Sequence, residues 1–208
     1  MPFVLTIAAI AAVGALLYYE ARRPMERRYP KMVASTGFVA VAIAVGALDT
    51  TFGTIVVVAL ALSWFGDLFL ALDGRGPFVA GLVAFLLGHV AYVVAFSYRG
   101  LGDDLIIPTI GVAAVAVAIA TWLLPTVPRD LKVAVIAYIA VISTMVALVM
   151  STNTFAADWR IPVGAIAFFV SDIFVARDRF AAPGFINRIL GLPLYYGGQL
   201  LLAWAAGC

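Results

Sequence analysis

Eight long apolar stretches dominate the sequence and leave few options for its fold. They cover residues 2–19, 32–48, 54–72, 77–97, 105–124, 131–150, 160–176 and 186–206. Each approaches the ~20 residues that a helix needs to cross ~30 Å of hydrocarbon. Backbone polar groups in lipid must be satisfied within their own segment, so the stretches are predicted to be helices. We therefore expect an all-α fold: a polytopic membrane bundle of eight transmembrane helices in one integral-membrane domain, residues 1–208.

The basic residues predict how these helices are oriented. With eight spans, all but two of the 13 Lys and Arg residues, Arg99 and Arg160, fall on one side of the membrane. Loops rich in Lys and Arg stay in the cytoplasm. We expect both ends of the chain outside the cytoplasm, in a multi-pass protein of the bacterial cytoplasmic membrane.

Ionisable residues inside the spans are the first candidates for function. Asp67, Asp172 and His89, the one histidine of the chain, lie within apolar stretches. An Asp at the centre of a membrane helix costs roughly 2.5–3.5 kcal/mol, so such residues usually serve a function or have a buried polar partner. A purely structural role remains an alternative for each: a carboxylate can bond a neighbouring backbone group, and a histidine can be buried in the core with its hydrogen bonds satisfied. Further polar residues at similar depth are Tyr92, Tyr195, Tyr196 and Gln199.

An internal repeat relates the two aspartates. Residues 65–73 (FGDLFLALD) resemble residues 170–178 (VSDIFVARD), with four identities at a constant offset of 105. The matched spans are the third and the seventh, which run the same way through the membrane. This favours a four-plus-four parallel duplication, although a chain biased toward Phe, Ala and Leu also produces such matches by chance. Gly81, Ala84 and Gly88 have the spacing of a small-residue helix-packing face.

Several classes of site are excluded or disfavoured by the residues present. One histidine and one cysteine, Cys208, cannot supply the several His or Cys ligands that zinc usually takes. The chain has no G-x-S-x-G elbow, P-loop or dinucleotide-binding glycine pattern. A carboxylate pair supported by His and Tyr remains, which suits acid–base chemistry with water as the nucleophile. Six other aspartates at span ends are interpreted as solvated: Asp49, Asp73, Asp103, Asp104, Asp130 and Asp158.

At these positions the sequence resembles the YhhN-like lysoplasmalogenase family of multi-span membrane hydrolases. The matching residues, in chain order, are Gly66-Asp67, Phe78, Gly81, Phe85, His89, Tyr92, Ser171-Asp172, Ala176, Phe180, Arg188 and Tyr195-Tyr196-x-x-Gln199, with Tyr138 and Met145 matching more loosely. Gly88, before the histidine, stands where animal members are expected to have Ala. The resemblance implies hydrolysis of the vinyl ether bond of lysoplasmalogens, which gives a fatty aldehyde and a glycerophospho-base.

Roles for the residues follow from that implied reaction. Vinyl ethers hydrolyse by protonation at carbon and addition of water to the resulting cation, which parallels the paired carboxylates of glycosidases. We expect Asp172 to be the acid and Asp67 the base, with His89 orienting a group or relaying a proton. Arg188 is expected to bind the lipid phosphate, or else to be an ordinary cytoplasmic arginine. The other expected substrate-binding residues are Tyr92, Ser171, Tyr195, Tyr196 and Gln199.

Two other classes of function also fit the sequence. A proton-coupled transporter carries intramembrane Asp and His residues and parallel repeats, but here the polar residues cluster in the cytoplasmic half. A lipid-binding receptor needs no titratable pair. We expect a lysophospholipid substrate in the bilayer, a site facing the cytoplasmic leaflet, and no cofactor, metal or nucleic-acid partner; the oligomeric state is left open.

Overall fold

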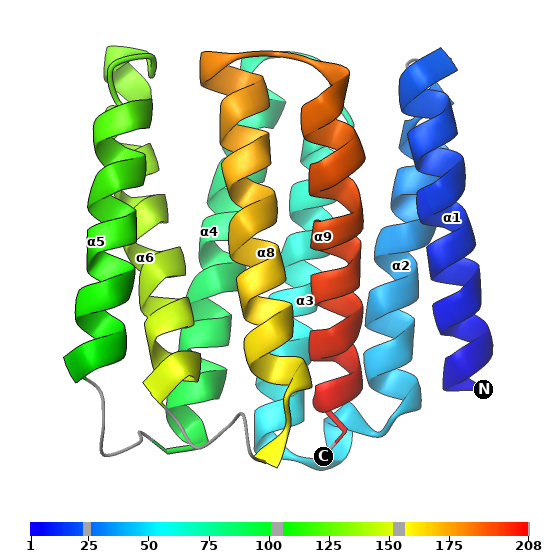
Figure 1. Ribbon diagram of the computed structural model, residues 1–208. Coiled ribbons are helices and arrows are strands. Elements are labelled where there is room, and N and C mark those ends of the chain that lie inside the picture. Colours follow the sequence, from blue (N-terminus) through cyan, green and yellow to red (C-terminus); the bar gives the residue numbers. More distant parts are fainter. Residues whose placement is uncertain (23–25, 101–105, 152–156, 208) are drawn as a thin grey trace.

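The structure, a computed structural model, is an all-helical bundle and describes residues 1–22, 26–100, 106–151 and 157–207 (Figure 1). Its long helices lie side by side, and each coincides with one predicted apolar stretch. Within the described ranges they are α1 (Pro2–Arg22), α2 (Arg28–Ala44), α3 (Thr51–Leu70), α4 (Arg75–Tyr98), α5 (Ile106–Leu123), α6 (Lys132–Ser151), α8 (Arg160–Ala176) and α9 (Phe185–Ala205).

Short helical turns join some of these helices. The 3-10 turns η2 (Ala47–Asp49) and η3 (Arg129–Leu131) precede α3 and α6, and the π-helical turn η4 (Arg177–Ala181) extends α8. The largest difference from the predicted boundaries is at α2, which begins and ends four residues early. It ends there because Gly46, at φ 84, turns the chain into η2 with a conformation that glycine adopts without strain.

Five helices in the described part of the chain are long and apolar enough to cross a membrane: α1, α3, α4, α5 and the helix Arg129–Met150 that contains α6. The chain is therefore an integral membrane protein by length and composition. Of the remaining three, α2 and α8 have 17 residues each. The third, α9, has 21 residues and contains Pro193.

Glycines set the closest helix pairs, α3 with α4 and α8 with α9. A Cβ added at Gly88 of α4 would lie 3.3 Å from the Ala59 carbonyl oxygen of α3, and one at Gly198 of α9 would lie 2.7 Å from the Gly164 carbonyl oxygen of α8. Small residues allow this approach of two backbones. The predicted packing face on α4 is confirmed.

Both ends of the chain lie at one end of the bundle, at the bottom of Figure 1. Arg99 and Arg160 follow or begin helices at that same end. The predicted cytoplasmic set, apart from Arg23, which is outside the described residues, lies at the opposite end, which we call the basic end: Arg22, Arg27, Arg28, Lys31, Arg75, Arg129, Lys132, Arg177, Arg179 and Arg188. Which end faces the cytoplasm stays a prediction.

The apolar interior is divided into two parts. The main cluster joins α1, α2, α3, α4, α6, α8 and α9. A small second cluster at the basic end of α5 and α6 is built on Leu123, Val127 and Val135, with Ile139 and Phe180 packed against it. The space between these two clusters contains the candidate site.

Candidate active site

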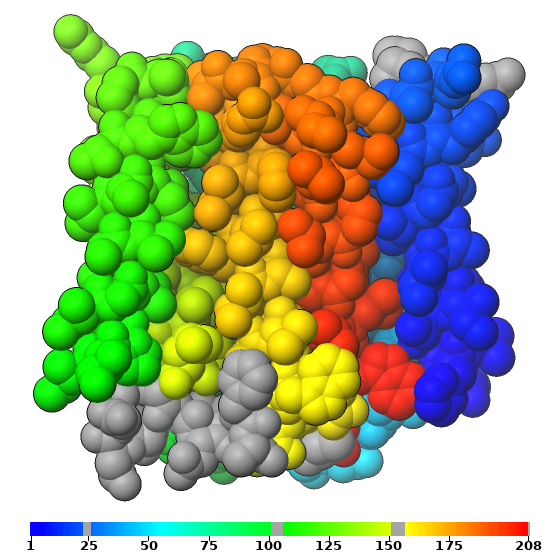
Figure 2. Space-filling view, viewed as in Figure 1, coloured from blue at the N-terminus to red at the C-terminus, as the bar shows by residue number. Residues whose placement is uncertain are grey.

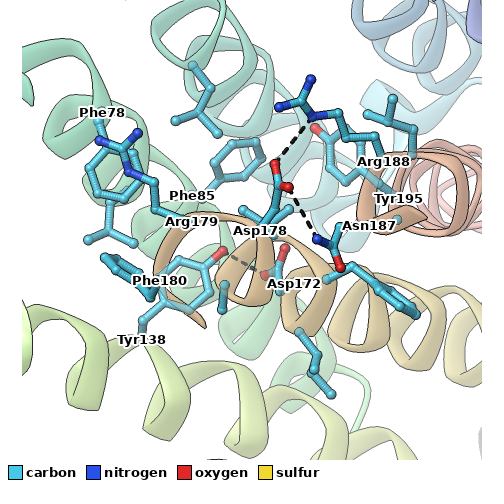
Figure 3. A pocket seen from close by; sticks show the side chains of 18 of the residues that line it. Phe78, Phe85, Tyr138, Asp172, Asp178, Arg179, Phe180, Asn187, Arg188 and Tyr195 are labelled. Carbon is cyan, nitrogen blue, oxygen red and sulfur yellow. Dashed lines mark hydrogen bonds and ion pairs between the residues drawn. The ribbon is translucent and has the colours of Figure 1, made fainter. Parts of the chain in front are cut away.

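A cavity of about 560 Å³ opens into the bundle from the basic end (Figure 3). Its polar lining comes from α1, α2, α3, α6, α8, η4 and α9, and its apolar lining mainly from α4, α5, α6 and α8. The polar lining residues include Glu20, Arg27, Lys31, Asp67, Tyr138, Asp172, Asp178, Arg188 and Tyr195. Volumes of 300–1,000 Å³ are typical of cavities that enclose a small molecule.

Asp67 lies in the last turn of α3 with a dense set of partners. Its Oδ2 accepts hydrogen bonds from Ser35 of α2 and from the Tyr195 hydroxyl of α9, both at 2.6 Å. Its Oδ1 lies 3.2 Å from the Lys31 ammonium. The residue is only 2% exposed, so a cation and two hydroxyl donors together replace the water that a buried carboxylate loses.

Asp172 lies in the last turns of α8. Within the described chain no Lys or Arg pairs with it, and a protonated His89 would be its one cationic neighbour. The Tyr138 hydroxyl of α6 donates to Oδ2 at 2.7 Å (Figure 3). His89 Nε2 lies 3.5 Å from the same oxygen. Asp172 faces the apolar part of the cavity, and 17% of its side chain is exposed.

The hydrogen bonds of His89 fix its tautomer. Its Nδ1 is 2.8 Å from the Phe85 carbonyl oxygen, and a carbonyl only accepts, so Nδ1 carries the hydrogen. A neutral ring then presents a lone pair at Nε2 toward Asp172. His89 is 1% exposed and packs against the Phe168 ring at 4.4 Å between centroids. It does not line the cavity but contacts three residues that do: Phe85, Tyr138 and Asp172.

Of the other predicted site residues, two line the cavity and four do not. Tyr195 and Arg188 line the cavity. Tyr92 and Gln199 lie deeper, where the Tyr92 hydroxyl donates to Gln199 Oε1 at 2.6 Å and Gln199 Nε2 has no hydrogen-bond partner within the described structure. Ser171 donates to the Phe168 carbonyl of its own helix. Tyr196 lies behind the Asp67 wall, 3.2 Å from Ser35.

A charged network surrounds the mouth of the cavity. Arg188 lies between Glu20 at 2.9 Å and Asp178 at 3.3 Å, and Figure 3 shows Asp178 between Arg188 and Asn187. Burial acts to raise the pKa of Asp178, but hydrogen bonds from the Gly184 N–H, Asn187 and Arg188 outweigh it and hold the pKa below its ordinary value. Asp178 is therefore an ionised part of the rim at neutral pH.

Sequence comparisons place this chain in a known family. The pattern of the YhhN family matches residues 27–206. This chain belongs to the YhhN family.

Curated relatives of this YhhN-family chain carry an activity in their names. The proteins named lysoplasmalogenase TMEM86A from Bos taurus and from Homo sapiens are each 31% identical to it over 159 residues, covering 74% of this chain and 65% of theirs. Lysoplasmalogenase TMEM86B from Sus scrofa is 30% identical over 128 residues, covering 61% of this chain and 52% of its own. The match thus spans less than two thirds of the length of these relatives. No solved structure matches the chain.

Sequence reasoning missed several polar residues that line the cavity, Glu20, Arg27, Lys31, Asp178, Arg179 and Asn187, and also Ser35, which donates to Asp67. Lys31 was counted as a loop charge because α2 was expected to start at residue 32. Tyr138 had only a loose motif match as its signal. The interpretation of Asp158 as solvated was wrong: it is 7% exposed and bonds the Arg160 guanidinium at 2.7 Å. Asp103 and Asp104 lie outside the described residues.

A metal centre has no obvious place among these residues. Within the ranges that the structure describes, no group of three or more His, Cys, Asp or Glu side chains lies close enough together to hold an ion. That the family's chemistry here needs no metal stays a prediction.

Proposed function

We propose that this YhhN-family protein is an integral membrane hydrolase that cleaves the vinyl ether bond of lysoplasmalogen-type lysophospholipids. The observation that carries the proposal is that the carboxyl groups of Asp67 and Asp172 open into one cavity, between a charged mouth and an apolar wall. The names of its relatives support the reaction. The products are a fatty aldehyde and glycerophosphoethanolamine or glycerophosphocholine.

The order of the cavity walls matches the order of groups along such a lipid. In a lysoplasmalogen the reacting bond lies between the glycerophospho headgroup and the hydrocarbon chain. The mouth carries Arg27, Arg188 and Asp178 for a zwitterionic headgroup, and the apolar wall carries Ile139 and Ile173 for a chain. The carboxyl groups lie where these two regions meet, which is where the vinyl ether comes to rest.

The reaction needs one proton donor and one activated water. Asp172 gives its proton to the alkenyl carbon farther from the ether oxygen, which creates an oxocarbenium ion. Asp67 takes a proton from water as the water adds to that cation. The hemiacetal then collapses: the carbon–oxygen bond to glycerol breaks as Asp67 returns its proton to the glycerol oxygen, and the aldehyde forms as the hemiacetal hydroxyl gives its proton to Asp172. One water is consumed and both carboxyl groups regain their starting states.

The surroundings of the two carboxyl groups support this division of roles. Lys31 and two hydroxyl donors stabilise Asp67 as an anion, which is the form a base requires. Asp172 faces the lone pair of His89 Nε2, which repels a carboxylate and accepts from a carboxylic acid. His89 thereby acts as a positioning residue, because its Nδ1–H is held by the Phe85 carbonyl oxygen and has no acceptor there to which a proton could be relayed.

The remaining predicted residues support the two aspartates and the lipid. Arg188 binds the phosphate as one member of the mouth network, since Glu20 and Asp178 already hold its guanidinium in place. Tyr195 positions Asp67 and borders the substrate. Ser171, Tyr196, Tyr92 and Gln199 contribute from behind the wall, by fixing the helices that carry the cavity residues.

The proposed membrane arrangement has eight spans, with both ends of the chain outside the cytoplasm of a bacterial cell and the cavity facing the cytoplasmic leaflet. The basic residues gathered at one end support it, as does the parallel alignment of α2, α8 and α9 with the five candidate membrane spans (Figure 1). Reporter fusions to both ends test it. A cytoplasmic signal from one end alone contradicts the even number of spans, and a cytoplasmic signal from both ends contradicts the orientation.

A four-plus-four parallel repeat also belongs to the proposal, and the helix packing supports it. α1 packs on α2 as α5 packs on α6, α3 on α4 as α8 on α9, and α2 on α9 as α6 on α4. Gly88 and Gly198 meet corresponding neighbours. At a constant offset of 105, these neighbours are Ala59, Leu62 and Ser63 on α3 and Gly164, Ala167 and Phe168 on α8.

An assay with purified protein in detergent tests the reaction. One substrate is a lysoplasmalogen, and its matched control is the saturated ether lysolipid with the same chain and headgroup. We expect aldehyde from the first only. In heavy water the aldehyde should carry one deuterium on the carbon next to its carbonyl group, since the mechanism protonates that carbon. No aldehyde release overturns the hydrolase proposal and leaves the transporter and lipid-receptor interpretations.

A further inference from the structure

Helix α5 is joined to the bundle on one side only. It packs against α6 and touches η4, but no extensive contact joins it to α8 among the described residues. The structure describes all of α5, and Leu123 is its one buried residue. Figure 2 shows α5 at the edge of the bundle, with a hollow along its seam with α8 in the upper half of the view.

The cavity extends from Asp172 to this seam. We call the part between α5, α6 and α8 the chain slot, defined by Ile119, Leu123, Val135, Ile139, Ile142 and Ile173, which all line the cavity. The slot lies between the main core and the small second cluster, which includes Leu123, Val135 and Ile139. No charged side chain belongs to it.

One residue of α8 marks where the slot meets the lipid. Val175, the residue before the end of α8, lines the cavity and is also 46% exposed. An apolar side chain that is both exposed and part of a cavity wall lies at an opening. Because α5 lies within the hydrocarbon layer in the proposed arrangement, that opening faces lipid chains instead of water.

The depth of the slot suits one hydrocarbon chain. Ile142 is ten residues into α6, about 15 Å below the start of that helix. One leaflet contributes about half of the ~30 Å hydrocarbon core. A lipid chain in that leaflet therefore extends over about the same depth as the slot. A lipid moving sideways between α5 and α8 keeps its headgroup at the mouth and its chain in an apolar medium.

We propose that the single hydrocarbon chain of a lysolipid enters from the bilayer through the opening at Val175 and lies in the chain slot. This rests on the proposed function for the identity of the lipid. It adds the route by which the lipid arrives, and it assigns Ile119 and its neighbours as residues that set chain-length preference.

Equilibrium binding tests the slot without requiring hydrolysis. The probes are saturated ether lysophosphocholines with octyl and hexadecyl chains, bound to the protein in mixed micelles. Ile119→Trp fills the slot, and Val117→Trp on the same helix is the control, since Val117 is 62% exposed and is not a lining residue. A chain excluded from the slot remains in the apolar interior of the micelle, so it loses only its packing contacts with the slot, and a hexadecyl chain loses more of them than an octyl chain. Ile119→Trp should therefore lower the hexadecyl-to-octyl affinity ratio, by roughly threefold, and Val117→Trp should leave it unchanged.

The association rate tests the route. Val175→Trp narrows the opening without filling the slot, and Val163→Trp, 37% exposed on the same helix, is its control. We expect slower association of the hexadecyl probe with Val175→Trp only. Equal rates for the two variants overturn the lateral route.

The two proposals fail in different ways. An unchanged chain-length ratio in Ile119→Trp overturns the slot even where aldehyde is released. A ratio that falls in a protein releasing no aldehyde upholds the slot and removes the hydrolase. Ile119→Phe, a smaller change, replaces Ile119→Trp where the melting temperature shows that Trp is not tolerated, and the same two outcomes apply to it.

Discussion

Asp67 and Asp172 occupy matching places in the two halves of the bundle but have opposite surroundings. Each lies near the basic end of its helix and accepts a hydroxyl hydrogen bond from a neighbouring helix, Ser35 of α2 for Asp67 and Tyr138 of α6 for Asp172. Asp67 also has an ammonium group at 3.2 Å. Asp172 has a histidine nitrogen at 3.5 Å instead.

In the proposed mechanism, this difference gives one repeated motif two chemical roles. A neighbouring cation favours the ionised form of a carboxyl group. An apolar wall and a facing lone pair favour the protonated form. Catalytic pairs of carboxyl groups depend on such unequal environments. The neighbours supplied by α2 and by α4 therefore decide which aspartate donates and which accepts.

Removing either carboxyl group should have the largest effect. Asp67→Asn and Asp172→Asn should each lower the rate of aldehyde release about 10²–10⁴-fold, the usual contribution of a general acid or base. The double variant should be little worse than the worse single one, because the two groups act as a unit. The melting temperature should hold in Asp172→Asn, since Asn keeps the size of Asp, but it should fall in Asp67→Asn, because the largely buried Lys31 then loses its anionic partner. The control is Asp49→Asn, since Asp49 is exposed at the opposite end of the bundle. Near-normal turnover in Asp67→Asn or in Asp172→Asn would remove the substituted aspartate from the mechanism.

Removing the cation beside Asp67 should come next. Lys31→Met leaves the Asp67 anion without its charged partner, and a hydrogen bond to a charged group contributes about 1.5–3 kcal/mol. Turnover should fall about 10–100-fold, whereas Lys31→Arg should retain most of it. Aldehyde-release kinetics measure both. Equal activity of Lys31→Met and the parent protein would show that Asp67 does not depend on this ion pair.

Much of this architecture could be predicted from the sequence, because lipid allows few backbone solutions. The eight helices followed from apolar length alone. The convergence of Asp67 and Asp172 on one cavity agrees with their matched motifs and matched depths. Depth along a helix is a property of position in the chain, so sequence alone carries it.

Direction around the helix axis was harder to predict. His89, Tyr92 and Gln199 have suitable depth, but glycine contacts between α3 and α4 and between α8 and α9 set which faces turn toward the cavity. Lys31 was missed for a different reason: the start of α2 was placed four residues late, which moved it from a cavity wall into a loop. Such an error at one helix end hides the charge that distinguishes the two aspartates.

The tyrosine hydroxyls give a smaller test of the same comparison. Tyr195→Phe removes one donor from Asp67, and Tyr138→Phe removes the one hydroxyl donor from Asp172. A single hydrogen bond contributes about 0.5–1.5 kcal/mol, so each variant should lose roughly 2–10-fold in kcat. The loss should be larger at Tyr138, because Asp67 keeps Ser35 and Lys31. A larger loss at Tyr195 would reverse the comparison.

Glu20 should show the smallest effect. It comes from α1, outside the residues that the family pattern matches, and holds Arg188 and Arg27 at the mouth. Glu20→Gln should raise KM a few-fold and leave kcat unchanged, since partly exposed ion pairs contribute at most about 1 kcal/mol. Initial rates over a range of lysoplasmalogen concentrations separate the two constants. A fall in kcat alone would place Glu20 in the chemistry.

Infrared spectroscopy of the protein in ester-free detergent at neutral pH tests the unequal protonation of the two aspartates most directly. A protonated carboxyl group has a carbonyl stretching band that a carboxylate lacks, and difference spectra between each Asn variant and the parent assign that band. The account predicts a carboxylic-acid band that disappears in Asp172→Asn and persists in Asp67→Asn. A band that disappears in Asp67→Asn and persists in Asp172→Asn would contradict it.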